Sequence, residues 1–337
     1  MESDYDVNEE TEFGVCNGYI VECTKNGVKW IDKEGHEKAS LILPLDNPIL
    51  KISDSNILIV NIDGRDVYSI EGFKVKWQKT LDDVDLIENS IINADIDDSG
   101  YVTVIQKAKR QKGAVTLIDP DGNVVFTQGK GEDFVLSALI SPDSKQMMMN
   151  TYNTTGITVN STLQFIDVSK IQENNGVPFV QIPRNDTVFS FIRFLNGNNV
   201  IAAGENFISC YNSDKRQDWE LKLKKVYSVD CAYDKYIIAA VKSDSKNIKI
   251  GSIKTDIVTY EFNGTVRSTF SLNEGVINIK AFNGLIAVNT GRQVVMTDVN
   301  GNLVGNYSSK MDINQVEFLD GSNAVVITKG TINVVNF

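Results

Sequence analysis

The chain has 337 residues, of which 42% are hydrophobic and 23% charged, values typical of a globular protein that can bury a full core. Its formal net charge of −11 and pI of about 4.7 give an acidic surface that repels phosphate backbones, which argues against nucleic acid as a partner. No stretch approaches the roughly 20 apolar residues of a membrane span, and no signal peptide is present.

The chain opens with the acidic stretch MESDYDVNEETE, which contains no Lys or Arg. We interpret it as a solvated native tail or as the cut end of a chain whose anchor was removed. From about Thr11 to Leu43 follows the first copy of a repeated unit. Its sequence VCNGYIVECTKNGVKWIDKEGHEKASL aligns with AFNGLIAVNTGRQVVMTDVNGNLVGNY near the C-terminus, with the same turns.

The repeated unit is four short strands joined by tight turns. Residues 275–310 contain VINIKAF, LIAVNTG, QVVMTDV and NLVGNYSS, separated by turns at Asn283-Gly284, Gly291-Arg292 and Asn300-Gly301. Asn-Gly suits a two-residue hairpin because both central residues of a type I′ turn need positive φ. A single sheet of four strands cannot bury either of its apolar faces alone, so copies must stack. The unit therefore predicts the blade of a β-propeller.

Turns between the last two strands mark seven such units, spaced about 37 to 50 residues apart, as in propeller repeats. The markers are Glu34-Gly35, Glu71-Gly72, Asp121-Gly122, Ser169-Lys170, Asp214-Lys215, Asn263-Gly264 and Asn300-Gly301.

The last residues, INQVEFLDGSNAVVITKGTINVVNF, supply three more strands. A propeller must close its ring, so we expect the segment around Tyr5 to Asn8 to supply the fourth. The prediction is an all-β propeller of eight four-stranded antiparallel blades, closed by strands from both termini, with seven blades as the alternative. Residues 1–12 are then an acidic closing segment, and residues 13–337 are one propeller domain.

Loop lengths favour one face of the disc. The first strand of a blade lines the channel, and successive turns alternate between the two faces. Three loops between second and third strands are expected to be long, at residues 106–113, 151–162 and 242–256, and such loops are often functional. The candidate binding residues on them are Lys107, Lys109, Arg110, Lys112, Tyr152, Asn153, Lys246, Lys249 and Lys254. The alternatives are simple drift in loop length and, for the basic residues, a solvated ribbon.

Residues suited to catalysis or metal binding are scarce. His36, the one histidine, has no Cys or His neighbour at ligand spacing, so we interpret it as a surface residue. A serine-hydrolase triad would need the same histidine, and no GxSxG, GxGxxG or Walker-type loop occurs. The run DIDDSG from Asp95 to Gly100 resembles the start of a calcium loop, but Gln106 stands where an EF-hand needs Glu. An acidic hairpin turn is the preferred interpretation, and no catalytic residue, metal or cofactor is predicted.

Cysteine and tryptophan positions indicate packing. The cysteines lie in strand-like runs without CxxC spacing, which favours buried free thiols, with a Cys16 to Cys23 bridge as the alternative. The tryptophans lie in third or fourth strands and are expected to pack between blades. These residues are Cys16, Cys23, Cys210 and Cys231, and Trp30, Trp77 and Trp219.

The runs GYIVECTKNGVKWIDKEGHEKASL, NPILKISDSNILIVNIDGRDVYSIEG, INADIDDSGYVTVI and ALISPDSKQMMMN resemble a family of uncharacterised propellers from Gram-positive bacterial cell envelopes. More distantly, the chain is similar to quinoprotein-type and WD-type propellers, since GFKVKW at residues 72–77 echoes the Gly-to-Trp spacing of quinoprotein blades. The resemblance implies a propeller displayed outside the membrane behind one membrane-spanning helix, and it carries over no catalytic residue and no cofactor.

The expected function is a non-catalytic, monomeric interaction module of the cell envelope that binds a protein or an envelope polymer. The alternatives are an enzyme that acts on carbohydrate or peptidoglycan through channel carboxylates, and a sensor of a small ligand in the channel. Carboxylates that come from different blades leave no local spacing to detect. Acidic side chains with raised pKa values at the channel mouth would favour the enzyme, whereas small apolar and hydroxyl residues would favour the interaction module.

Overall fold

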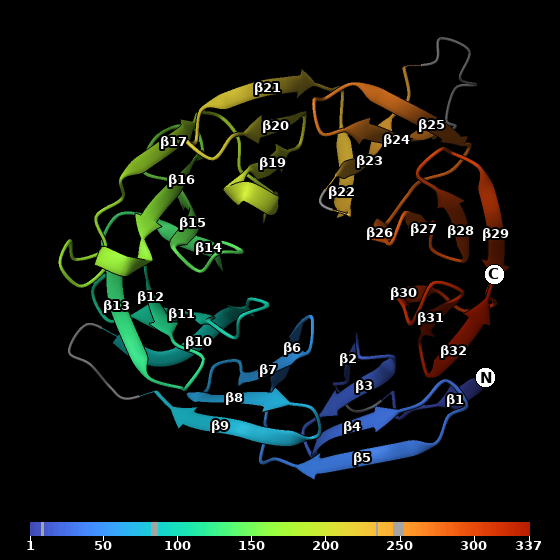
Figure 1. Ribbon diagram of the computed structural model, residues 1–337, viewed down its shortest axis with the longest axis horizontal. Coiled ribbons are helices and arrows are strands. Elements are labelled where there is room, and N and C mark those ends of the chain that lie inside the picture. The colour runs from blue at the N-terminus through green and yellow to red at the C-terminus, as the bar shows by residue number, and fades with distance from the viewer. Residues whose placement is uncertain (8–9, 82–86, 234, 245–252) are drawn as a thin grey trace.

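The computed structural model is a ring of eight four-stranded antiparallel sheets around a central channel (Figure 1). It describes all residues except 8–9, 82–86, 234 and 245–252. Each sheet is one blade; its strands run in chain order from the channel outward, except that β1 forms the outer strand of the last blade. The prediction of eight blades is therefore confirmed, and the alternative of seven is wrong.

The first four blades span residues 12–184. Blade 1 contains β2 (Glu12–Cys16), β3 (Tyr19–Thr24), β4 (Gly27–Ile31) and β5 (Glu37–Ile42). Blade 2 contains β6 (Pro48–Ser53), β7 (Asn56–Asn61), β8 (Asp66–Glu71) and β9 (Lys74–Thr80). Blade 3 contains β10 (Ile87–Ile96), β11 (Val102–Ala108), β12 (Gly113–Ile118) and β13 (Val124–Lys130). Blade 4 contains β14 (Phe134–Ile140), β15 (Gln146–Asn153), β16 (Asn160–Asp167) and β17 (Val180–Arg184).

The last four blades include both ends of the chain. Blade 5 contains β18 (Phe191–Phe194), β19 (Val200–Gly204), β20 (Phe207–Tyr211) and β21 (Gln217–Lys222). Blade 6 contains β22 (Val226–Ala232), β23 (Tyr236–Lys242), β24 (Thr255–Glu261) and β25 (Val266–Leu272). Blade 7 contains β26 (Asn278–Phe282), β27 (Leu285–Asn289), β28 (Gln293–Asp298) and β29 (Leu303–Ser308). Blade 8 contains β30 (Ile313–Phe318), β31 (Asn323–Thr328), β32 (Thr331–Asn336) and β1 (Glu2–Asp4).

Burial differs between the strands of a blade. Every residue of β7, NILIVN, is buried because neighbouring blades cover both faces of the sheet. The outer strand β29, LVGNYS, alternates between exposed and half-buried residues because solvent covers one of its faces. The hydrophobic clusters lie between neighbouring blades, as where Trp30 of blade 1 packs in one cluster with Ile57 and Tyr68 of blade 2. The core is thus distributed around the ring.

The ring closes through β1, which pairs antiparallel with β32, placing Ser3 opposite Ile332. The closing strand, Glu2–Asp4, precedes the expected segment around Tyr5 to Asn8, of which Asn8 lies outside the described residues; this corrects that part of the prediction. Tyr5 donates its N–H to the carbonyl of Gly330 and its hydroxyl to the carbonyl of Thr328, and its ring packs edge-on against Phe13. These contacts hold Tyr5 against the turn between β31 and β32 and against blade 1, directly after the closing strand ends at Asp4.

Tryptophans of the outer strands join neighbouring blades. Trp77 of blade 2 donates its indole N–H to the carbonyl of Pro120, and Trp219 of blade 5 donates to Phe262. Each indole lies on the glycine of the next blade's outer turn, where a Cβ on Gly122 or Gly264 would come within 3.0 Å of the ring. Both glycines also have positive φ, which side chains disfavour. The expectation that the tryptophans pack between blades is confirmed.

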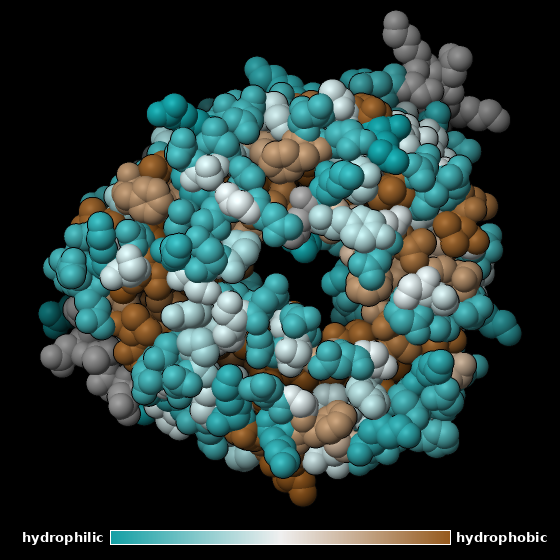
Figure 2. All heavy atoms as spheres, viewed as in Figure 1, coloured by the Kyte–Doolittle hydropathy of each residue, from teal (hydrophilic) through white to brown (hydrophobic). Residues whose placement is uncertain are grey.

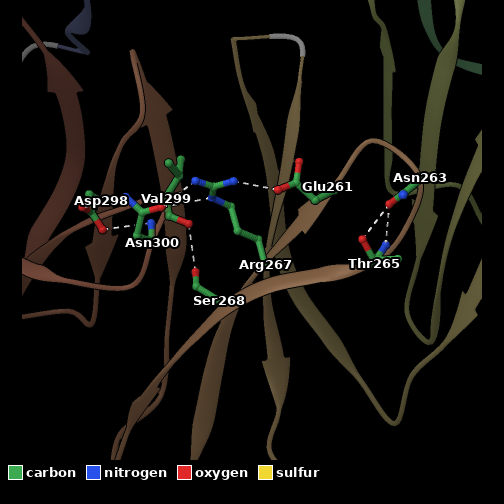
Figure 3. A network of polar contacts seen from close by, with 8 residues as sticks. All are labelled: Glu261, Asn263, Thr265, Arg267, Ser268, Asp298, Val299 and Asn300. Atoms are coloured by element: carbon green, nitrogen blue, oxygen red, sulfur yellow. Dashed lines mark hydrogen bonds and ion pairs between the residues drawn. The ribbon is translucent and has the colours of Figure 1, made fainter.

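A polar version of this contact joins blades 6 and 7 (Figure 3). Ser268 donates its hydroxyl to the carbonyl of Val299 at 2.9 Å. Arg267 reaches from Glu261 of its own blade to the side chain of Asn300 in the next, with distances of 2.7 Å on each side. Because the donors and acceptors come from different sheets, these bonds fix the angle between the blades.

The four cysteines are buried free thiols. The alternative of a Cys16 to Cys23 bridge is wrong, because the register of β2 and β3 places Cys23 opposite Glu12. Burial raises the pKa of Cys23 to about 12, so this thiol stays protonated at neutral pH.

Within the described part of the chain, helical structure is restricted to two 3-10 turns, η1 (Val168–Lys170) and η2 (Asn196–Asn198). No helix among these residues is long and apolar enough to cross a membrane.

Candidate functional site

Successive turns of an antiparallel blade alternate between the two faces of the disc. The loops between second and third strands therefore share one face with the links between blades. We call this the loop face; its loops include residues 109–112 and 154–159 and, in blade 6, residues 243–244 and 253–254 on either side of the part that the structure does not describe. The turns between first and second strands and between third and fourth strands lie on the opposite face.

All three expected loops are shorter than the sequence suggested, that of blade 6 only slightly. Strands β11 and β12 extend into residues 106–113 and leave only 109–112 outside them. The equivalent loop of blade 2, residues 62–65, has the same length, so the blade 3 loop is not unusually long. The blade 4 loop covers 154–159, and the blade 6 loop covers 243–254. Excess length therefore belongs to blades 4 and 6.

Blades 3 and 4 bring two predicted residues together on the loop face. The ammonium of Lys112 lies 5.0 Å from the centroid of the Phe134 ring, within the range of a cation–π contact. Phe134 stacks on Tyr152 with ring centroids 5.1 Å apart and an interplanar angle of 19°. Since Phe134 and Tyr152 pair directly across β14 and β15, the register of blade 4 sets this stack.

Polar contacts hold the surroundings of this stack. Asn153, another predicted residue, donates to the carboxylate of Asp133 at 2.9 Å and to the carbonyl of Glu132 at 3.2 Å. Lys130 donates to Oε1 of Gln164 at 3.1 Å in the seam between the blades. Burial lowers the pKa of Lys130 to about 8, although Asp133 opposes the shift. We call these residues the loop cluster: Lys112, Lys130, Asp133, Phe134, Tyr152 and Asn153.

The other predicted residues lie apart from the loop cluster or outside the described chain. Lys107 forms an ion pair with Asp63 of blade 2 at 2.6 Å. Lys109 and Arg110 are exposed on the blade 3 loop. Lys254 is half-buried at the base of the blade 6 loop, where its carbonyl accepts from the N–H of Ser243. Lys246 and Lys249 lie outside the residues that the structure describes.

Sequence reasoning missed Phe134, Lys130 and Asp133. Phe134 begins the inner strand of blade 4, and Lys130 ends the outer strand of blade 3, so they flank the link between the blades. The sequence could have indicated them only by their positions at strand ends, next to the polar link between the blades. That signal is weak, because the contact with Lys112 depends on how two sheets pack.

The channel is open along the axis, and mainly hydrophilic residues surround it (Figure 2). A cavity of about 750 Å³ on the axis is lined by inner-strand residues from different sides of the ring. On one side, Arg193 of β18 pairs with Asp230 of β22 at 3.0 Å, and Lys280 of β26 pairs with Glu317 of β30 at 2.9 Å. We call this side, formed by blades 5 to 8, the paired wall.

The other side, formed by blades 1 to 3, carries charges that are not paired. Glu12 of β2, Lys51 of β6 and Asp95 of β10 occur on successive inner strands, and among the described residues no ion pair joins Lys51 to either carboxylate. Burial raises the pKa of Glu12 and of Asp95, and Lys51 only partly opposes it. We call this side the unpaired wall. Acidic groups with raised pKa values thus occur at the channel, the observation that was expected to favour the enzyme alternative.

Comparison with protein families identifies one match over residues 1–337, described as "Family of unknown function (DUF5711)". No curated protein matches the chain.

Solved structures with the same fold are distant in sequence. BamB from Moraxella catarrhalis is 13% identical, with a TM-score of 0.63 over 100% of this chain and 98% of that chain. Chaetomium thermophilum Sqt1, solved bound to the N-terminus of the ribosomal protein L10, is 11% identical, with a TM-score of 0.62 over 95% and 94% of the two chains. The dihydro-heme d1 dehydrogenase NirN, in complex with DHE, is 13% identical, with a TM-score of 0.63 over 94% and 70%. At these identities the likeness establishes the fold alone.

Proposed function

The chain belongs to this family of unknown function, and we propose that it is a non-catalytic interaction module whose loop cluster binds an acidic segment of a protein partner. The observation that carries the proposal is the contact of Lys112, Phe134 and Tyr152 across two blades. Aromatic rings and a cation held together by stacking are typical of interface anchors. That Sqt1 was solved with a protein segment bound supports such a use of this fold.

Charge favours an acidic partner at this place. The blade 3 loop adds Lys109 and Arg110 beside Lys112 on a chain with a net charge of −11. A carboxylate of the partner near Lys130 would raise the lowered pKa of this lysine. Above pH about 8, where free Lys130 has lost its proton, binding of an anion would therefore be coupled to proton uptake by Lys130. The neighbouring loop fully exposes Ile157, which supplies apolar area for the same interface.

The test compares three forms of the propeller as bait in solubilised cell envelope. The first is the wild type, and the second carries Lys112→Glu with Tyr152→Ala. The third carries Lys170→Glu, which makes the same charge change at an exposed site on the opposite face. We expect a protein that the wild type and Lys170→Glu capture equally, and the purified partner should bind the loop-cluster variant at least about tenfold more weakly.

Capture of an anionic envelope polymer in place of a protein would reassign the partner class. Equal binding of one purified protein by all three forms would exclude the loop cluster as its site.

We further propose an extracytoplasmic location. Met1 lies beside Gly35 in an outer turn of blade 1, which is on the face opposite the loop face. An anchor joined there would leave the loop face directed away from the membrane. Because the four native cysteines are buried, Arg110→Cys should be the main site of labelling by a membrane-impermeant maleimide in intact cells. Labelling only after lysis would contradict this location.

The channel gives a second candidate function, an enzyme that acts on a carbohydrate. The observation in its favour is the raised pKa of Glu12 and Asp95, since a general acid needs a protonated carboxyl group. Turnover of a chromogenic glycoside panel that is lost in both Glu12→Gln and Asp95→Asn would support it. Turnover that both variants retain would exclude these carboxylates.

A further inference from the structure

A second cavity, separate from the loop cluster, opens at the channel mouth on the opposite face. Its volume is about 310 Å³, at the lower end of the range for small-molecule pockets. Residues from the inner strands of blades 2 to 5 and from their adjoining turns line it. Ser53, Asp98 and Arg193 line both this cavity and the axial one, so the two spaces are adjacent.

The cavity places a guanidinium opposite carboxylates. Arg193 lines it from the paired wall, where 44% of its side chain is exposed and its partner Asp230 is only 13% exposed. In the described part of the chain its guanidinium makes one hydrogen bond, from Nη1 to Asp230 at 3.0 Å. A guanidinium has further N–H donors in a planar fork that matches a carboxylate. Arg193 can therefore hold Asp230 and a ligand carboxylate together.

The carboxylates belong to blade 3. Asp95 accepts from the N–H of Ile96 through Oδ1, and Asp98 accepts from the hydroxyl of Ser53 through Oδ1 at 2.5 Å. Among the described residues, no hydrogen-bond donor reaches the Oδ2 atom of Asp95 or of Asp98. Asp97 lies between them in the sequence, but its carboxylate stabilises the turn by accepting a hydrogen bond from the N–H of Tyr101 at 2.7 Å. Two carboxylates thus remain for a positive group.

The character of the cavity favours an organic ligand over a metal ion. No group of three or more acidic, histidine or cysteine side chains in the described residues could hold a metal. Leu139, Ile140 and Phe194 add apolar surface to the lining. Ligand pockets of this kind combine apolar walls with a few charged groups that set the orientation of the ligand.

We propose that this cavity binds a small zwitterion, an amino acid or a short peptide with free ends. Its carboxylate pairs with Arg193, its ammonium pairs with Asp95 and Asp98, and an apolar side chain lies against Leu139 and Phe194. The ammonium would supply a positive partner to Asp95 and Asp98, and the carboxylate would use the N–H donors of Arg193 that Asp230 leaves available. The raised pKa of Asp95 agrees with this, because an ammonium nearby would stabilise the ionised carboxylate.

The test uses the intact chain and defined ligands. Binding of L-leucine and L-alanyl-L-leucine is measured by titration calorimetry, alongside the N-acetylated and C-terminally amidated forms of each. We expect a free zwitterion to bind, and each blocked form to bind at least about tenfold more weakly, because each loses a charge-assisted contact. This comparison needs no mutation, so a folding defect cannot confuse it.

Variants then locate the site. Asp95→Asn with Asp98→Asn should weaken the free zwitterion about tenfold or more, as should Arg193→Lys, which keeps a cation beside Asp230. The control is Asp54→Asn, which removes a carboxylate that lines only the axial cavity and should leave binding unchanged.

Three results would overturn the proposal. They are no binding of either free zwitterion, equal binding of the amidated forms, or equal binding to the Asp95 and Asp98 variant.

Discussion

The two walls of the channel use charge differently. On the paired wall, Asp230 and Glu317 lie behind Arg193 and Lys280, as their side-chain exposures of 13% and 19% against 44% and 45% show. The pKa of Lys280 is raised: burial alone would lower it, but the attraction and hydrogen bond of Glu317 more than offset the effect of burial. These bonds join blade 5 to blade 6 and blade 7 to blade 8, so their charges support the ring.

The unpaired wall has the same kinds of residue without such bonds. Glu12 and Asp95 flank Lys51 on successive strands, and burial leaves both carboxylates with raised pKa values. Desolvated carboxylates without partners lower the stability of the folded state. The comparison teaches that position on an inner strand does not decide the role of a charge; whether the neighbouring blade supplies a partner does. Unpaired charges of this kind are typical of binding sites.

The largest expected effect comes from removing a buried partner on the paired wall. Asp230→Ala would leave Arg193 uncompensated and would remove the acceptor of the N–H groups of Cys231 and Ala281. We expect a loss of about 3 kcal/mol in the free energy of unfolding, measured by urea denaturation. Asp230→Asn, which keeps an acceptor oxygen, serves as the control and should lose less. A loss below about 1 kcal/mol in Asp230→Ala would mean that the wall does not depend on this pair.

A smaller effect is expected at the more exposed pair of the same wall. Glu317→Ala removes the partner of Lys280 and an acceptor of Gln315, but Lys280 can reach water in the channel. We expect a loss of about 1 kcal/mol in the urea unfolding free energy. High salt should reduce the difference from the wild type, because solvent ions screen an open pair. A difference that is independent of salt would contradict this explanation.

On the unpaired wall, removing a carboxylate should not lower the stability of the folded state. Asp95→Asn removes an ionised group that burial destabilises, so the melting temperature at pH 7 should stay unchanged or rise slightly. The matched control is Asp230→Asn on the paired wall, which should lower it. A clear drop in the melting temperature of Asp95→Asn would show that Asp95 has a stabilising partner after all.

The dependence of stability on pH should show the same contrast. The folded-state pKa values of Glu12, Asp95 and Asp97 are raised above their ordinary values, so folding takes up protons between the two pKa values of each group. Their cost to stability is fully present at neutral pH and disappears as the pH falls through the raised values toward the ordinary ones. The combined variant Glu12→Gln, Asp95→Asn should therefore gain less stability than the wild type as the pH falls from neutral toward the ordinary carboxyl pKa values of 4.5 and 3.8, as urea titrations at each pH would reveal. Identical pH profiles would contradict the raised values.

Much of the fold follows from local sequence. Turns such as Asp121-Gly122 and Asn300-Gly301 need positive φ at the glycine, and in the structure both Gly122 and Gly301 have positive φ. The buried run NILIVN and the alternating run LVGNYS separate middle from outer strands without any tertiary information. The number of blades could be counted from these signals because each blade is specified by residues close together in the chain.

Contacts between distant residues were harder to predict. The closing strand, Glu2–Asp4, pairs with β32 at the other end of the chain, so local sequence does not show which residues pair. Tyr5, which was expected to begin this strand, instead contacts Gly330 and Phe13. The extent of the blade 3 loop was overestimated for a related reason. Strand β11 continues to Ala108 because that residue pairs with Ile87 of β10, and β12 begins at Gly113 because that residue pairs with Lys130 of β13.

The sequence alone determined that Lys112, Tyr152 and Asn153 share one face, since the alternation of turns follows from the order of strands. Only the tertiary structure decided that Phe134 joins Lys112 to Tyr152, and that Arg193 pairs with Asp230 while Lys51 forms no ion pair with another described residue. Strand order and turn chemistry are local properties of about 40 residues in a blade. Charge pairing across the channel depends on the angle and register between separate blades, which the packing of their buried faces sets.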